Sequence, residues 1–180
     1  MIQIILIAIA LSMDAFAVSI ALGLDTHSTT KNKMSLTAGL FFGLFQGFMP
    51  LLSIFLCKVS ETCMIYIQEG KIPAILLFFV GLKMFFSYFF ENLDEKRNNV
   101  NWKYFVFLAF ATSVDAFFVG PVILSLSFNF IFSILIIILT TFLFSYFGVM
   151  FGNKLGVYVG KKAELLGASI LCVMGILFWM

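Results

Sequence analysis

Long apolar segments alternate with short polar stretches along the whole chain. Six of these segments span roughly residues 2–24, 35–57, 72–90, 104–126, 129–151 and 161–180. The hydrocarbon core of a bilayer is about 30 Å thick, so a helix of about 20 apolar residues can cross it. The segments are continuously apolar and lack the alternation typical of membrane β-barrel strands. The pattern therefore predicts an all-α integral membrane protein with six transmembrane helices.

The composition agrees with this pattern and excludes a soluble domain. Hydrophobic residues make up 62% of the 180 residues and charged residues only 11%, which is more apolar surface than a soluble domain of this size can bury. The first segment has no basic region before it and no small-residue cleavage site, so we predict a retained helix rather than a removed signal. We expect the lipid bilayer as its surroundings and no nucleic acid as a partner.

Basic residues are distributed unevenly between the connections, and this distribution predicts the topology. The second and fourth connections carry only two, Lys58 and Lys71, against eight in the first, third and fifth. Those eight are Lys31, Lys33, Lys96, Arg97, Lys103, Lys154, Lys161 and Lys162. Because cytoplasmic loops carry the excess of positive charge, the odd-numbered connections are predicted to face the cytoplasm. The chain is thus predicted to be a multi-pass protein of the cell (plasma) membrane with both termini outside.

Two aspartates lie near the middle of apolar segments. Asp14 is the only charged residue from Ile4 to Leu24, and Asp115 lies at the same place in the stretch ATSVDAFFVG. Aligning residues 10–19 with residues 111–120 gives six identities, so the aspartates belong to an internal repeat. A carboxylate at such a depth costs about 2.5–3.5 kcal/mol on insertion scales, and these residues are typically functional. The alternative interpretation is a structural hydrogen bond to a neighbouring helix.

The repeat and the predicted topology together indicate two inverted halves. The aspartates lie in the first and fourth segments, so their helices are predicted to run antiparallel. In inverted-topology folds the substrate site lies near the bilayer midplane, where the halves meet. We therefore predict a single transmembrane domain over residues 1–180. It would consist of three-helix repeats at residues 1–90 and 104–180, joined by a cytoplasmic linker at residues 91–103.

Oxygen atoms dominate the polar side chains that are predicted at the depth of the aspartates. The candidate metal-binding residues are Asp14, Asp115, Ser12, Ser113, Thr112 and Gln46. Oxygen ligands suit magnesium, calcium or manganese and disfavour copper(I) and zinc. Gln46 has two interpretations, a hydrogen bond between helices or a neutral oxygen ligand. The three cysteines have no metal-ligand spacing and are interpreted as small apolar residues.

Glycine rows and two unusual residues add structural expectations. Glycine recurs at every fourth position over residues 39–47 and again over residues 148–160, a spacing typical of close helix packing in membranes. Lys83 is interpreted either as a side chain that snorkels to the interface or as a counter-charge to an empty acidic site. Pro121 leaves the carbonyl of Phe117 without its helical partner. This either kinks the helix or offers a carbonyl oxygen to an ion.

The ordered set of motifs resembles a known transporter family. LSMDAFAVS, GLFFGLFQ with its following proline, GLKM, ATSVDAF and KKAELLG are similar to the successive signature segments of the MntP-type manganese efflux pumps, in the wider lysine-exporter superfamily. The resemblance covers all six predicted segments. It implies a six-helix exporter of manganese(II), with the family's motif aspartates at Asp14 and Asp115. Many members carry an acid at the position of Gln46, and small residues where this chain has Phe118 and Pro121.

The sequence favours a secondary transporter over the alternatives. The chain contains no nucleotide-binding motif such as GxxxxGK[ST], so the energy for export has to come from a gradient or a partner. Two carboxylates can carry one divalent cation outward and two protons back. We expect no enzyme activity and no resident cofactor, with manganese(II) and protons as transported ions, and we leave a homo-oligomer open. The alternatives are export of an amino acid or of another divalent cation, an intramembrane aspartyl protease, and a purely structural membrane protein.

Overall fold

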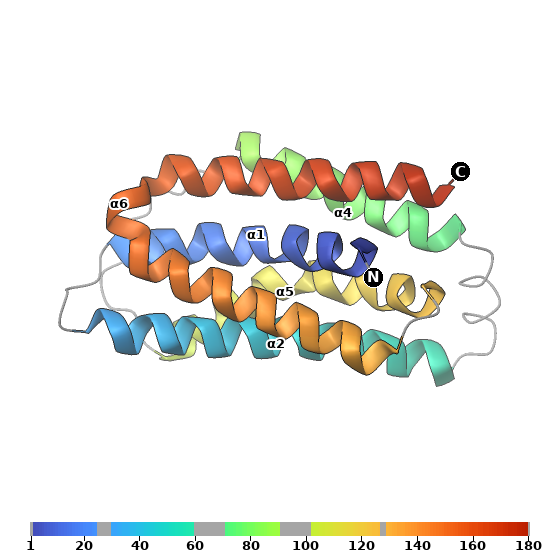
Figure 1. Ribbon diagram of the computed structural model, residues 1–180, viewed down its shortest axis with the longest axis horizontal. Helices are drawn as coiled ribbons and strands as arrows, with labels where there is room; N and C mark the ends of the chain where they lie inside the picture. The colour runs from blue at the N-terminus through green and yellow to red at the C-terminus, as the bar shows by residue number, and fades with distance from the viewer. Residues whose placement is uncertain (1, 25–29, 60–70, 91–101, 127–128, 180) are drawn as a thin grey trace.

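The computed structural model describes residues 2–24, 30–59, 71–90, 102–126 and 129–179, and every regular element in these ranges is an α-helix. The helices are α1 (Ile2–Leu24), α2 (Lys31–Val59), α4 (Lys71–Phe90), α5 (Trp102–Ser125) and α6 (Phe130–Trp179) (Figure 1). Each predicted segment lies inside one of these helices, apart from one residue at some ends. The first segment and α1 have the same bounds, residues 2–24. The all-α class is therefore confirmed, whereas most of the predicted linker lies outside the described residues.

The last two predicted segments form one long element, α6, with a break inside it. A polar connection is predicted between residues 151 and 161, but the helix continues through Asn153 and Lys154 and is interrupted only at Gly156 (φ 69°, ψ 164°). Glycine adopts a positive φ without the steric penalty that a Cβ atom brings. One glycine thus replaces the expected loop. We refer to residues 130–155 as the first half of α6 and to residues 157–179 as the second half.

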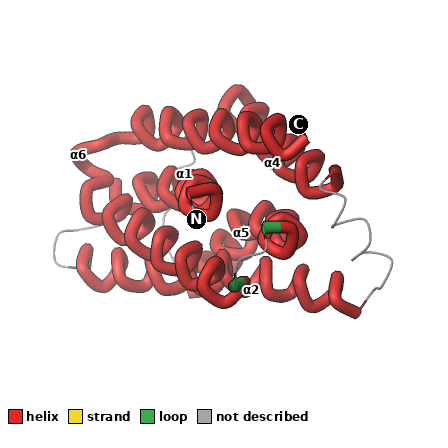
Figure 2. Tube along the Cα trace, turned by 45° about the vertical axis from the view of Figure 1, so that its right-hand side comes forward, coloured by secondary structure: helices red, strands yellow, loops and turns green. Residues whose placement is uncertain are grey.

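The central helix α1 lies between the two halves of α6 (Figure 1). A methyl group placed on Gly148, in the first half, would lie 2.8 Å from the Cβ atom of Ser19. One placed on Gly160, in the second half, would lie 3.2 Å from the Cα atom of Ala17. The tube in Figure 2 shows α2 beside the first half and α4 beside the second half, whereas α5 packs mainly on α2. The small residues in α1 and α6 therefore allow α1 to pack closely on both sides.

The two aspartate helices, α1 and α5, run in opposite directions, as predicted (Figure 1). Along α2 and α5, Phe41 packs on Phe105 with ring centroids 6.3 Å apart. Further along both helices, Gly120 lies against Ser53, so α2 and α5 run parallel. Because α1 and α2 are antiparallel neighbours in the chain, α1 is antiparallel to α5 as well.

The glycine row of α2 packs against the first half of α6, which confirms the predicted packing role. A methyl group on Gly39 would lie 2.9 Å from the ring of Phe142, and one on Gly43 would lie 3.0 Å from the carbonyl oxygen of Ile138. A methyl group on Gly47 would overlap the side chain of Ile138. Small residues at this spacing let helix backbones approach closely, which favours helix association in lipid.

The outer surface of the bundle is apolar, as expected of a protein surrounded by lipid. Large apolar side chains such as Leu44, Phe55, Phe107 and Leu139 are at least 60% exposed. In the described residues, four helical stretches are long and apolar enough to cross a membrane, and Leu165–Leu177 is a shorter apolar helix. The four are Ile2–Leu24, Lys31–Lys58, Phe105–Ser125 and Phe130–Gly156. The chain is a multi-pass membrane protein.

Candidate metal-transport site

Asp14 and Asp115 both lie near the middle of their helices. Asp14 is the thirteenth of the 23 residues of α1, and Asp115 is the fourteenth of the 24 residues of α5. Asp14 is partly buried, and its Oδ1 accepts a hydrogen bond of 3.0 Å from the backbone N–H of Ala15. Asp115 is only 2% exposed. A carboxylate that is removed from water in this way needs hydrogen bonds, a nearby cation or a proton to offset the lost hydration.

The side chain of Gln46 joins the three helices α1, α2 and α5 at this depth. Its Nε2 donates a hydrogen bond of 2.8 Å to the carbonyl oxygen of Leu11 in α1. Its Oε1 accepts a hydrogen bond of 3.3 Å from the hydroxyl of Ser113 in α5. Gln46 is fully buried, so both bonds are shielded from water. The structure thus shows the hydrogen bond between helices that was one of the two interpretations of Gln46, and brings Gln46 and Ser113 together.

The hydrogen bonds of Gln46 also show how the two aspartates are placed relative to one another. Leu11 and Ser113 lie at about the same depth in the bundle, because both bond to the side chain of Gln46. Asp14 follows Leu11 by three residues in α1, and Asp115 follows Ser113 by two residues in α5. At about 1.5 Å per residue, these offsets are about 4.5 Å and about 3 Å. The helices are antiparallel, so the aspartates lie on opposite sides of this level. Side chains on a helix tilt toward its N-terminus, so both carboxylates are expected to lean back toward Gln46.

The hydroxyl of Ser113 also donates to the carbonyl oxygen of Ala109 in its own helix at 2.5 Å, and the other two hydroxyl candidates bond to their own helices as well. The hydroxyl of Ser12 donates to the carbonyl oxygen of Ile9 at 2.8 Å. The hydroxyl of Thr112 donates to the carbonyl oxygen of Leu108 at 3.0 Å. Such local bonds are common for Ser and Thr within helices. Each hydroxyl oxygen keeps lone pairs that a cation can use, but neither side chain is part of the Gln46 link.

Asp14 belongs to the face of α1 that packs on the second half of α6. Its neighbours one turn away on this face are Ala10 and Ala17. A methyl group placed on Gly167 would lie 2.7 Å from the carbonyl oxygen of Ala10, and Gly160 lies close to Ala17. The predicted row of small residues beside Asp14 therefore does serve close packing. It brings two helix backbones together on either side of the carboxylate.

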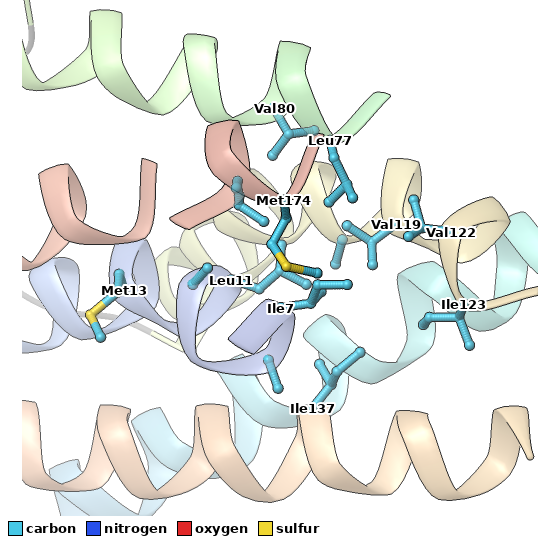
Figure 3. Close-up of a cluster of buried hydrophobic side chains, with 14 of the residues drawn as sticks. Ile7, Leu11, Met13, Leu77, Val80, Val119, Val122, Ile123, Ile137 and Met174 are labelled. Carbon is cyan, nitrogen blue, oxygen red and sulfur yellow. The ribbon is translucent and has the colours of Figure 1, made fainter. Parts of the chain in front are cut away.

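Asp115 lies directly before the first α5 residue, Ala116, of the apolar core that α5 shares with α1, α4 and α6. Figure 3 shows Val119 of α5 near Ile7 of α1, Leu77 of α4 and Met174 of α6. All four side chains are at most 4% exposed. This core closes one side of the region around Asp115. It separates the polar residues at mid-depth from the end of the bundle where α5 ends.

The described residues contain no cluster of three or more His, Cys, Asp or Glu side chains that could hold a metal ion. A divalent cation bound beside Asp14 and Asp115 would therefore meet no third His, Cys, Asp or Glu side chain of the described residues, and its other ligands would be neutral oxygen atoms. That donor set suits a hard or borderline cation that retains part of its water shell. The side chain of Lys83, the suggested counter-charge, lies outside the described residues.

We predict that Gln46→Leu destabilises the bundle, because it removes both hydrogen bonds and leaves the buried hydroxyl of Ser113 and carbonyl of Leu11 with fewer partners. The loss in free energy of unfolding should be about 0.5–2 kcal/mol, the usual range for a hydrogen bond between helices in a membrane. Thermal unfolding in detergent measures it. Thr37→Val is the control, since the exposed hydroxyl of Thr37 bonds only to its own helix. A Gln46→Leu protein as stable as the unaltered one would show that the link contributes nothing.

Sequence reasoning missed a second group of polar residues. Ser19, Thr141 and Ser145 are fully buried, although none was singled out as a candidate. The spacing of Thr141, Ser145 and Gly148 at four and three residues places them on one helix face and could have indicated this group. Their partner face on α1 depends on tertiary packing and could not be read from the sequence.

Comparison with known proteins places the chain in a family. The family model described as "Putative manganese efflux pump" matches residues 29–178. Proteins that carry the same description are 39% identical in Aliarcobacter butzleri (98% of this chain, 97% of that protein) and 38% identical in Methanosphaera stadtmanae (97% and 96%). A third, from Methanobrevibacter smithii, is 37% identical (98% and 95%). No solved structure matches the chain. The chain belongs to the MntP family.

Proposed function

We propose that this protein exports manganese(II) from the cytoplasm in exchange for protons, through a site built on Asp14 and Asp115. The observation that carries the proposal is the pair of mid-helix carboxylates on antiparallel helices that Gln46 joins. Manganese as the cargo follows from family membership and from the names of the relatives. Gln46 and Ser113 would add neutral oxygens beside the ion, with Ser12 and Thr112 further out.

Reciprocal contacts support an inverted-repeat architecture for the proposed transporter. In α4 and the second half of α6, Gly81 packs against Cys172, and Gly175 packs against Phe78. Gly81 lies 94 positions before Gly175, and Phe78 lies 94 positions before Cys172. A two-fold rotation that relates α4 to the second half of α6 would therefore exchange one contact with the other. Six spans in two inverted halves would follow, at residues 1–90 and 104–180 with a linker at 91–103. Such repeats alternate access to a site where the halves meet.

The energetics favour proton exchange over simple release. Moving a divalent cation out of a negative interior costs roughly 4.6 kcal/mol at 100 mV, at about 2.3 kcal/mol per charge. If the two carboxylates carry one M²⁺ outward and two protons inward, no net charge moves and this term cancels. Protonation also neutralises the empty carboxylates on the return step, when no cation offsets their burial. With both termini outside the plasma membrane, the cytoplasmic side would be where α1 ends.

Proteoliposomes test this proposal. An imposed pH gradient should drive manganese movement in one direction, and reversing the gradient should reverse it. A pH-sensitive dye inside the vesicles should report about two protons per manganese ion, the ratio at which charge cancels. Magnesium, cobalt, zinc, cadmium and lysine in parallel vesicles would define the cargo. Manganese movement that follows voltage alone, without proton flux, would exclude the exchange mechanism.

A further inference from the structure

Three buried hydroxyl groups lie between α1 and the first half of α6 without hydrogen-bond partners. Ser19, Thr141 and Ser145 are each 0% exposed. Within the described part of the chain, their oxygens have no hydrogen-bond partner. The neighbouring Thr140, by contrast, donates to the carbonyl oxygen of Ile136 at 2.7 Å. An unpaired hydroxyl in an apolar interior is costly, and three at one interface call for a ligand that pairs with them.

The three hydroxyls belong to two helix faces that pack on one another. Thr141, Ser145 and Gly148 share one face of α6, and a methyl group on Gly148 would lie 2.8 Å from the Cβ atom of Ser19. One turn further on, a methyl group on Gly152 would lie 2.6 Å from the carbonyl oxygen of Ile20. The hydroxyls therefore line the interface of α1 with the first half of α6, over a length of about 10 Å at 1.5 Å per residue.

This interface is separate from the candidate metal site. Ser19 lies five residues after Asp14 in α1, which is about 140° around the helix axis at 100° per residue. The Gln46 link attaches to α1 at Leu11, which lies between the two, about 60° from Asp14 and about 80° from Ser19. The hydroxyls are neutral, so they offer no charge to hold a divalent cation. Water, which both donates and accepts and needs two to four polar partners, is the ligand that fits.

We propose that a short file of water molecules occupies the interface between α1 and the first half of α6. The file extends from the level of Ser19 to the level of Ser12, which is the depth of Asp14, because beyond Ser19 the glycines Gly23 and Gly152 bring the two backbones into contact. This part of the inference rests on the proposed function: the file gives protons a route apart from the metal. Each oxygen along the file accepts one proton and passes another on, so one proton enters, one leaves, and the file is unchanged.

Two adjacent threonines provide a matched test in the full-length protein. Thr141→Val should lower manganese-driven proton flux in proteoliposomes severalfold, because it removes one hydroxyl of the file. Thr140→Val removes a hydroxyl that is already bonded to its own helix and should leave the flux unchanged. Thr141→Ser keeps the hydroxyl and should restore the flux, which separates loss of the hydroxyl from a packing defect. A Thr141→Val protein with unchanged flux and a higher melting temperature would show a dry interface and overturn the proposal.

Thiol labelling tests for water independently of proton exchange. In a protein with its native cysteines replaced, Ser145→Cys should react with a small hydrophilic thiol reagent. Ile137→Cys, equally buried at 0% exposed but in the apolar core, should not react. If the unaltered protein moves manganese without protons, the exchange mechanism fails, and labelling alone decides whether the file exists. Absence of labelling at Ser145→Cys, with the protein folded, would exclude the file whatever the transport mechanism.

Discussion

Asp14→Asn and Asp115→Asn are each expected to abolish manganese export while the protein still inserts and folds. Asparagine keeps the shape of the side chain but carries no charge, so it cannot offset the charge of a divalent cation or exchange a proton. The substitution also lowers the insertion cost of a mid-membrane carboxylate, about 2.5–3.5 kcal/mol, so misfolding is not the expected cause of the loss. Manganese content and tolerance of cells that express each variant measure the effect.

The control for both aspartate variants is Asp94→Asn, in the polar stretch between α4 and α5. It makes the same chemical change outside the apolar segments and should retain full export. Thermal unfolding of the purified variants checks that they are folded. If either site variant exports at the normal rate and at normal abundance, the two aspartates do not form a shared site, and the proposed mechanism fails with it.

Gly43→Leu is expected to reduce the amount of folded protein sharply, by a route different from that of the aspartate variants. Gly43 lies in the middle of the glycine row, where even a methyl group would lie 3.0 Å from the carbonyl oxygen of Ile138. A leucine would have to separate α2 from the first half of α6. Overpacking of this kind typically costs about 1–3 kcal/mol, and more where backbone is the obstacle. Abundance in the membrane and melting temperature in detergent measure the loss.

Leu44→Phe is the matched control for this packing prediction. Leu44 is the next residue in α2 and is 60% exposed on the outer surface, so a larger side chain there meets lipid rather than protein. It should be tolerated in abundance, stability and export. Normal abundance and activity of Gly43→Leu would mean that the helices can separate at this position without loss, contrary to the contacts in the structure.

Local pattern in the sequence determined most of the helices and the depth of the candidate site. Continuous apolar runs of about 20 residues predict membrane helices whatever their neighbours, because the bilayer sets the length. A lone carboxylate in such a run has few other uses, which is why Asp14 and Asp115 could be chosen without a structure. The glycine row at Gly39, Gly43 and Gly47 predicted a packing face for the same local reason. The break at Gly156 was missed because a single glycine and a polar loop give similar sequence patterns.

The tertiary structure alone decided which polar groups meet. Gln46 lies 35 positions from Leu11 and 67 from Ser113, so its two hydrogen bonds depend on how α1, α2 and α5 pack. In the same way, Ser19 and Thr141 share an interface only because α1 lies between the halves of α6. Helix periodicity specifies which residues share a face, but it does not specify which face of another helix lies opposite. The sequence therefore determined the two carboxylates and their depth, and packing between distant segments decided what surrounds them.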